Sequence, residues 1–163
     1  MITKLIEIYA GPGAGKSTLA AQLFTRYKTF STYSVELVQE AAKEQAWLGH
    51  PICQSDVFFE QARRVDRLMG NVDIIITDSP LALSGYYGGS KWDELADSIY
   101  QSWLREQHTI TKVFLSRTKP FDPRGRYQTE EQATQVCEAL KTMHRFHHVG
   151  DATSIIEFLG EKK

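Results

Sequence analysis

Cysteine is scarce in this sequence, and neither sign of charge is in clear excess. Cys53 and Cys137 are isolated, without the spacing of a zinc site or a disulfide framework, so we expect reduced thiols in a cytoplasm. The 19 basic and 20 acidic residues give a net charge of −1, which argues against bulk electrostatic binding to nucleic acid but not against a local basic groove. No apolar run approaches the ~20 residues of a membrane span, and we expect no membrane segment and no secretory signal.

The sequence of 163 residues has an ordinary globular composition, with 42% hydrophobic, 11% aromatic and 24% charged residues. We expect one domain over residues 1–163, because two cores of normal size would be cramped in this length. Strand-like and helix-like stretches alternate, which predicts a parallel sheet covered on both faces and a three-layer α/β fold. The strands are expected at 2–9, 35–36, 72–77, 113–115 and 146–149. Helices are expected at 16–27, before 49–51, and at 55–69, 92–103, 129–143 and 153–160, with a loop over 79–90.

The strongest motif covers residues 10–18, Ala-Gly-Pro-Gly-Ala-Gly-Lys-Ser-Thr. It fits the phosphate-binding loop G-x-x-x-x-G-K-[ST], with Ala10 in place of the first glycine. The glycine spacing does not fit the dinucleotide pattern G-x-G-x-x-G, so a Rossmann site is disfavoured. The predicted ATP-binding residues are Gly11, Pro12, Gly13, Ala14, Gly15, Lys16, Ser17 and Thr18.

The loop residues have separate chemical roles. Pro12 has no N–H, so the phosphate oxygens must be bound chiefly by the backbone N–H groups from Gly13 to Ser17. The helix that begins here directs the positive end of its dipole at the phosphates. We expect Lys16 to reach the β- and γ-phosphates, Ser17 to bind Mg²⁺ and Thr18 to assist at the α-phosphate.

A carboxylate follows the hydrophobic strand that contains Ile74–Ile76. Asp78 stands at the carboxyl end of this strand, where open α/β sheets bind ligands. It could hold Mg²⁺, orient an attacking group or accept its proton, and the alternative is that it only begins a turn before Ser79-Pro80. We expect Asp73, earlier in the same run, to reach the sheet edge or solvent.

The phosphate loop, the strand ending at Asp78 and a later arginine-rich loop resemble the small P-loop kinases of nucleosides and nucleotides. The chain resembles most the AAA_28-type P-loop proteins, which include a ribosylnicotinamide-kinase-like group and many phage-encoded proteins. Residues 35–41 resemble the acidic segment of these proteins, and residues 121–131 resemble their lid and following helix. The resemblance implies a parallel sheet in the order 2-3-1-4-5, an acceptor-binding region at about 36–70 and a lid loop at about 116–129.

The same resemblance suggests residues that bind the phosphate acceptor. Glu36 matches the acceptor-binding carboxylate best, with Glu40 one helical turn later, and Glu36 could act as the base in place of Asp78. The alternative is that Glu36 only begins a helix. Gln54 resembles the glutamine with which deoxynucleoside kinases read a base. Their Glu-Arg-Ser signature is replaced here by Asp78-Ser79-Pro80, so a deoxynucleoside acceptor is not implied.

Two further groups could bind an acceptor or merely pack. Tyr86 and Tyr87 lie beyond the Asp78 strand, where their rings could stack on a base or fill the loop. The arginines at positions 63, 64 and 67 form either a solvated helix face or a surface for an acceptor phosphate or a DNA backbone.

Arginines of the expected lid complete the predicted site. Arg117, Arg124 and Arg126 surround a loop with prolines and a glycine, and their guanidinium groups could stabilise charge on a transferring phosphoryl group. Arg117 is also a predicted ATP-binding residue. The alternative is an ordinary basic loop. The histidines at 144, 147 and 148 lack an accompanying cysteine or carboxylate set, and we do not expect them to bind a metal.

These residues predict an ATP- and Mg²⁺-dependent phosphotransferase with a nucleoside, nucleotide or related nucleobase compound as acceptor, in the cytoplasm of a cell or of an infected host. Lys16, Asp78, Glu36, Arg124 and Arg126 are the expected catalytic residues. One alternative is a phage-type kinase of 5-hydroxymethyluracil in DNA, which needs the base extruded or the strand open. The other is a regulatory ATPase switch that binds a protein partner.

Overall fold

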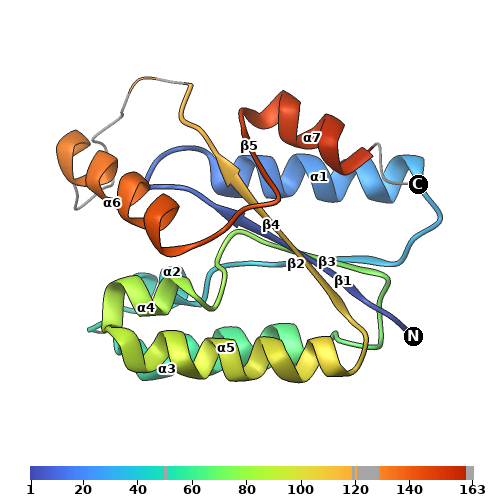
Figure 1. Ribbon diagram of the computed structural model, residues 1–163, viewed down its shortest axis with the longest axis horizontal. Helices are drawn as coiled ribbons and strands as arrows, with labels where there is room; N and C mark the ends of the chain where they lie inside the picture. Colours follow the sequence, from blue (N-terminus) through green and yellow to red (C-terminus); the bar gives the residue numbers. More distant parts are fainter. Residues whose placement is uncertain (50, 119, 121–128, 161–163) are drawn as a thin grey trace.

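The structure is a computed structural model, which describes residues 1–49, 51–118, 120 and 129–160. Its strands are β1 (Lys4–Tyr9), β2 (Val35–Val38), β3 (Ile74–Thr77), β4 (Thr109–Leu115) and β5 (His148–Gly150). Its helices are α1 (Lys16–Phe30), α2 (Ala41–Trp47), α3 (Gln54–Asp66), α4 (Leu83–Gly88), α5 (Ser90–Arg105), α6 (Glu130–Met143) and α7 (Ala152–Gly160). The strands form one parallel five-stranded sheet in the order β2-β3-β1-β4-β5, which confirms the predicted fold class and strand order (Figure 1).

Helices cover both faces of the sheet (Figure 1). Successive side chains of a strand point to opposite faces, so Ile6 and Ile8 of β1 pack with the buried residues of α1 and α7. Leu5 packs on the other face with α3 and α5, and Tyr9 packs there with α6. In the described part of the chain, no helix combines the length and the apolar character needed to cross a membrane.

The segment 79–90, predicted to be a loop, contains helix α4. This prediction was wrong because Gly85 serves close packing inside the helix, and the chain breaks only at Gly89, whose φ of 94° ends α4. A methyl group on Gly85 would lie only 1.7 Å from Asp93 Oδ1 of α5, so the absence of a side chain lets α4 and α5 approach each other.

Several predicted boundaries also shift. Helix α1 continues to Phe30, and β2 continues to Val38. Strand β4 begins at Thr109 and not at residue 113, because residues 109–112 pair in register with residues 4–7 of β1. Helix α6 begins with a capping box: the Thr129 side chain accepts a hydrogen bond from Gln132 N, and the Gln132 side chain accepts one from Thr129 N.

The parallel sheet brings the ends of β1 and β3 to the same edge. Glu7 of β1 pairs in register with Thr77 of β3, so the phosphate loop and Asp78 each follow neighbouring strands. This is the edge at which α/β sheets of this kind bind ligands.

A buried carboxylate lies in β1, close to the start of the phosphate loop. Glu7 is only 1% exposed, and it accepts hydrogen bonds from the Tyr100 hydroxyl at 2.6 Å and the Tyr9 hydroxyl at 3.1 Å. Tyr100 in turn accepts from Ala82 N at 3.2 Å. Burial raises the pKa of Glu7, although Lys112 and the two hydroxyls act in the opposite direction. The network ties β1 to α5 and to the segment that follows Asp78.

The raised pKa of Glu7 predicts how Glu7→Gln changes the dependence of stability on pH. In the folded protein Glu7 keeps its proton at pH values above the ordinary pKa of 4.5. The contribution of protonated Glu7 to the unfolding free energy is therefore fully present below pH 4.5 and is lost as the pH rises through the pKa of the folded state. The amide of the substituted side chain does not titrate. The unfolding free energy of the wild type should therefore fall relative to that of the variant as pH rises, and urea unfolding of both proteins from about pH 4 to about pH 8 measures this difference. If the difference in unfolding free energy between the two proteins did not change with pH, the raised pKa of Glu7 would be contradicted.

Candidate nucleotide and acceptor site

The phosphate loop has the backbone conformation that its glycines permit. Gly13 and Gly15 have φ angles of 78° and 101°, in the left-handed region that other residues rarely adopt. Gly15 is the N-cap of α1 and has no side chain, so it leaves the first N–H groups of the helix available to a ligand. The loop therefore presents a helix N-terminus of the kind that binds phosphate.

Two cations hold the loop from either side. Lys16 Nζ donates a hydrogen bond to the carbonyl oxygen of Ala10 at 3.1 Å, so Lys16 folds back across the loop. Arg117, just beyond β4, donates from Nη2 to the carbonyl oxygen of Pro12 at 2.7 Å. Arg117 was predicted to bind the nucleotide, and the structure places it against the backbone of the phosphate loop.

Gly11 fixes the distance between the loop and helix α6. A methyl group on Gly11 would lie 2.5 Å from Cys137 Sγ and 2.7 Å from the carbonyl oxygen of Ala133. The second contact is with backbone, which a side-chain rotation cannot relieve. The glycine therefore allows α6 to pack directly on the phosphate loop.

We expect Gly11→Ala to destabilise the fold by about 1–3 kcal/mol, the usual cost of overpacking. Thermal unfolding and ATP binding of the variant would measure the effect on the fold and on the loop. Gly160→Ala is the matched control, because its methyl group would meet only Arg26 Nη2 at an ordinary 3.8 Å. Adding Cys137→Ala to the Gly11→Ala variant should restore only part of the lost stability, because the contact with the Ala133 carbonyl oxygen remains. Equal stability of the Gly11 and Gly160 variants would contradict this packing.

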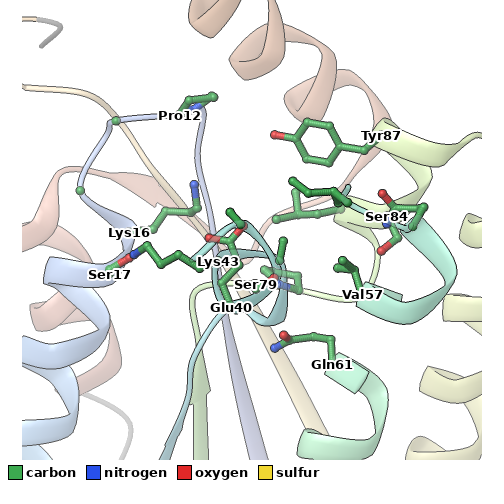
Figure 2. Close-up of a pocket in the computed structure, with 18 of the residues that line it drawn as sticks. Pro12, Lys16, Ser17, Glu40, Lys43, Val57, Gln61, Ser79, Ser84 and Tyr87 are labelled. Carbon is green, nitrogen blue, oxygen red and sulfur yellow. The ribbon is translucent and has the colours of Figure 1, made fainter. Parts of the chain in front are cut away.

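A cavity of about 710 Å³ extends from the phosphate loop to helices α2, α3 and α4. Figure 2 shows Lys16 and Ser17 of the loop on one side and Tyr87, Ser84 and Val57 on the other. Thr18 also lines it. The lining residues outside the loop and α1 are Glu40, Ala42, Lys43, Ala46, Ile52, Gln54, Val57, Gln61, Ser79, Pro80, Leu83, Ser84 and Tyr87.

The cavity brings together three of the predicted acceptor residues: Glu40, Gln54 and Tyr87. It does not include Glu36, which lies within β2, is exposed and forms an ion pair with Lys28 at 3.7 Å. The prediction of Glu36 as an acceptor ligand or base fails on position, because β2 continues past it to Val38 and the chain turns toward the cavity only at Glu40.

Tyr86 and Tyr87 separate into two roles. Tyr86 packs against the buried cluster that contains Tyr9 and Phe114, whereas Tyr87 lines the cavity and contacts Tyr86 edge-on at 5.0 Å. Of the two, Tyr87 lines the cavity, where its ring could stack on a base, whereas Tyr86 follows the alternative that the ring packs.

Gln61 is a cavity residue that sequence reasoning missed. It is 2% exposed, accepts a hydrogen bond from Ala41 N at 3.0 Å and donates from Nε2 to Thr77 Oγ1 at 3.3 Å. Gln61 thus joins the start of α2 to the end of β3. The signal in the sequence was an amide on the apolar face of α3, between Phe58 and Val65.

Asp78 has a buried oxygen that other residues leave free. Asp78 is 6% exposed, and its Oδ1 has no hydrogen-bond partner among the residues that the structure describes. A turn-forming aspartate accepts a hydrogen bond from the N–H two residues later, but that residue here is Pro80, which has no N–H. Thr77 Oγ1, not Asp78, accepts from Ser79 N at 3.1 Å. Asp78 is not among the residues that line the cavity, but a buried carboxylate oxygen in this state has the chemistry of a Mg²⁺ ligand, which is the role predicted for Asp78 and Ser17.

The arginines of α3 are mostly neutralised by neighbouring carboxylates. Arg64 Nε donates to Glu60 at 2.8 Å and its Nη2 pairs with Glu44, while Arg63 pairs with Glu60 at 2.9 Å. The hydrogen bond from Arg64 holds the pKa of Glu60 below its ordinary value. These pairs favour a solvated helix face over a surface for phosphate.

The lid arginines and the histidines are the remaining predicted residues. Arg124 and Arg126, with most of the predicted lid at 116–129, lie outside the described residues. His147 Nδ1 accepts from Lys112 N, and His148 Nε2 pairs with Ser154 Oγ at 2.6 Å, so these two rings serve separate structural contacts. The described residues contain no group of three or more histidine, cysteine or carboxylate side chains that could hold a metal ion.

Solved structures similar to this chain have P-loop architectures. Kti12 from Chaetomium thermophilum, solved with ADP-AlF3, is 15% identical with a TM-score of 0.60, and the match covers 96% of this chain and 97% of that one. The APS kinase CysC of Mycobacterium tuberculosis, solved with AMPPNP and APS, is 11% identical with a TM-score of 0.56, covering 98% and 99%. APE1195 is 14% identical with a TM-score of 0.58, covering 97% and 92%.

At these identities the likeness concerns the fold alone. No curated protein matches the sequence significantly. The sequence model of the AAA_28 family, described as an AAA domain, matches residues 5–150, which include both the phosphate loop and Asp78. The protein therefore belongs to the AAA_28 family and has the nucleotide-binding fold of the P-loop kinases and NTPases.

Proposed function

We propose that the protein is an ATP-dependent phosphotransferase that acts on a nucleoside, nucleotide or related nucleobase compound. The observation that carries the proposal is the buried Oδ1 of Asp78, which has no hydrogen-bond partner among the described residues and follows the strand that pairs with β1 ahead of the phosphate loop. A structural carboxylate in such a position would be expected to find a donor. The oxygen is instead suited to a metal ion or to the hydroxyl group of an acceptor.

The residues support a transfer without a covalent intermediate. Lys16 would exchange its bond with the Ala10 carbonyl oxygen for the β- and γ-phosphates, and the N–H groups from Gly13 to Ser17 would orient them. When bound between Ser17 and Asp78, Mg²⁺ would neutralise charge on the phosphates.

The reaction itself is a single displacement at phosphorus. The acceptor oxygen forms a bond to the γ-phosphorus as the bond from that phosphorus to the ADP oxygen breaks, and the acceptor proton passes to a carboxylate. Glu40 and Asp78 are the candidates for this base, because Glu40 lines the cavity and Asp78 directly follows β3, the strand that pairs with β1 ahead of the phosphate loop. Arg117, Arg124 and Arg126 remain our prediction for the lid.

An acceptor panel tests this function. The protein with Mg²⁺ and γ-labelled ATP should label a nucleoside, a nucleotide or a related compound faster than it releases labelled phosphate. Release of phosphate at the same rate with every acceptor would contradict the proposal and favour the regulatory ATPase switch. Partner binding that changes with nucleotide would then identify that switch.

The panel should include DNA that contains 5-hydroxymethyluracil, because one observation favours a larger acceptor. Trp47 and Leu48 are 75% and 69% exposed at the end of α2, and Ile52, which lines the cavity, is also exposed. The exposed Trp47 ring could stack on an extruded base or a neighbouring base, and Ile52 could pack against it from the cavity. If this DNA is labelled and free compounds are labelled little, the acceptor is the modified base in DNA and not a small molecule.

A further inference from the structure

Two opposite charges, Glu40 and Lys43, line the part of the cavity beyond the phosphate loop without pairing with each other. Glu40 is the N-cap of α2, and Lys43 lies in the first turn of the same helix. Both line the cavity that begins at the phosphate loop, and Figure 2 shows them between the loop and the α4 side chains. The spacing of three residues would permit an ion pair, yet none within 4.0 Å is found between these two described side chains.

The neighbouring charges do not neutralise Lys43 either. Glu44, the next residue of α2, pairs with Arg64 of α3, and Arg64 also binds Glu60. Within the part of the chain that the structure describes, no carboxylate pairs with Lys43. The Lys43 ammonium group is therefore available to an anion that enters the cavity.

The other lining groups restrict what such an anion could belong to. Tyr87 presents a ring to the cavity, and Gln54 presents an amide. Burial raises the pKa of the Tyr87 phenol most, and the nearby negative charge of Glu40 raises it further. A carboxylate and an amide bind hydroxyl and amino groups, and an exposed aromatic ring stacks on a planar ring.

An uncharged acceptor would leave Lys43 poorly matched. Lys43 is exposed, so a neutral molecule in the cavity would leave its ammonium group in water and would gain nothing from its charge. A phosphate offers that charge and charge-assisted hydrogen bonds. We infer that the acceptor is a small phosphate monoester with a planar ring, such as a nucleoside monophosphate, whose phosphate binds Lys43 and whose hydroxyl or amino groups bind Glu40. This inference rests on the proposed function, because it names the substrate class of the same cavity.

Equilibrium binding tests the inference without turnover. Calorimetry would compare the common nucleoside monophosphates with the corresponding nucleosides, for the wild type and for Lys43→Gln. We expect at least one monophosphate to bind about tenfold or more tightly than its nucleoside, and Lys43→Gln to remove most of that advantage. Binding of the nucleosides and of ATP should change less than about twofold. Lys43→Arg should retain most of the advantage because it keeps the charge.

Lys141→Gln is the matched control. Lys141 is an exposed lysine of α6 that pairs with Glu138 at 3.2 Å and does not line the cavity. Its loss should therefore change the affinity neither for nucleosides nor for nucleoside monophosphates. A monophosphate preference that survives Lys43→Gln would overturn the inference, as would the absence of any preference in the wild type. An equal loss of ATP affinity would also overturn it, because Lys43 would then be an ATP residue.

Transfer assays separate this inference from the proposed function. If nucleosides and monophosphates receive label with the same kcat/KM and Lys43→Gln alters neither, the inference fails while the kinase assignment stands. If Lys43→Gln removes monophosphate binding but no acceptor receives label, the anion site stands and the kinase assignment fails. A short oligonucleotide included as a third ligand distinguishes a free monophosphate from a backbone phosphate, and tighter binding of the oligonucleotide through Lys43 would overturn the small-molecule class.

Discussion

Lys16→Ala should reduce phosphoryl transfer by about 10²–10³-fold, the cost of removing one preorganised donor at a site where charge develops. Lys16 reaches across the phosphate loop to the Ala10 carbonyl oxygen at 3.1 Å, and its ammonium group would leave this oxygen for the β- and γ-phosphates when ATP binds. Single-turnover transfer at saturating ATP and acceptor would measure the loss. ATP binding should weaken as well, because the lysine contacts the ground state too.

The fold should survive this change. Lys16 is only partly buried, and the buried residues of α1 are Leu19, Ala20 and Leu23. Lys28→Ala, on the same helix and remote from the cavity, is the matched control and should leave transfer unchanged. Normal transfer with normal ATP affinity in Lys16→Ala would show that this loop is not the phosphate site.

Asp78→Asn should lower turnover more than it lowers affinity for ATP, with an expected loss in turnover of about 10²-fold or more. The amide keeps the shape of the side chain but removes the charge that would bind Mg²⁺ or accept a proton. Turnover and ATP affinity, each measured across a Mg²⁺ titration, would separate the two roles. A shift of the titration to higher Mg²⁺ indicates a metal ligand, and a lower plateau without a shift indicates a base.

Asp73→Asn is the control for Asp78. Asp73 immediately precedes the same strand, and its carboxylate accepts hydrogen bonds from the backbone N and the hydroxyl of Ser34, which hold its pKa below the ordinary value. Its loss should affect stability slightly and leave the Mg²⁺ titration unchanged. Unchanged turnover in Asp78→Asn at every Mg²⁺ concentration would reduce Asp78 to a residue of the turn.

The sequence predicted those parts of the fold and site that depend on local pattern. The glycines and Lys16 of the phosphate loop must be adjacent in the chain to act together, so a short motif records them. Asp78 was found because it directly follows a run of buried residues, and parallel pairing of β3 with β1 brings it beside the loop. The strand order itself came from the family resemblance, since hydrophobic periodicity carries no information on which strands are neighbours.

The parts that were missed depend on contacts between distant segments. Glu36 and Glu40 are both carboxylates near the end of β2, and only the length of that strand decides which one reaches the cavity. Gln61 resembles a core position until Ala41 and Thr77 are seen on either side of its amide. Helix α4 was missed because Gly85, which suggests a loop, is required by the close approach of Asp93.

The central claim is that the phosphate loop and Asp78 transfer the γ-phosphoryl group of ATP to an acceptor. Its most direct test follows γ-labelled ATP with Mg²⁺ and the acceptor panel, and analyses the acceptors by mass spectrometry in a single turnover. The account predicts that the label moves intact to one acceptor in the wild type, and that this product is strongly reduced in Lys16→Ala and Asp78→Asn. Label found only in inorganic phosphate, at a rate that no acceptor changes, would contradict it.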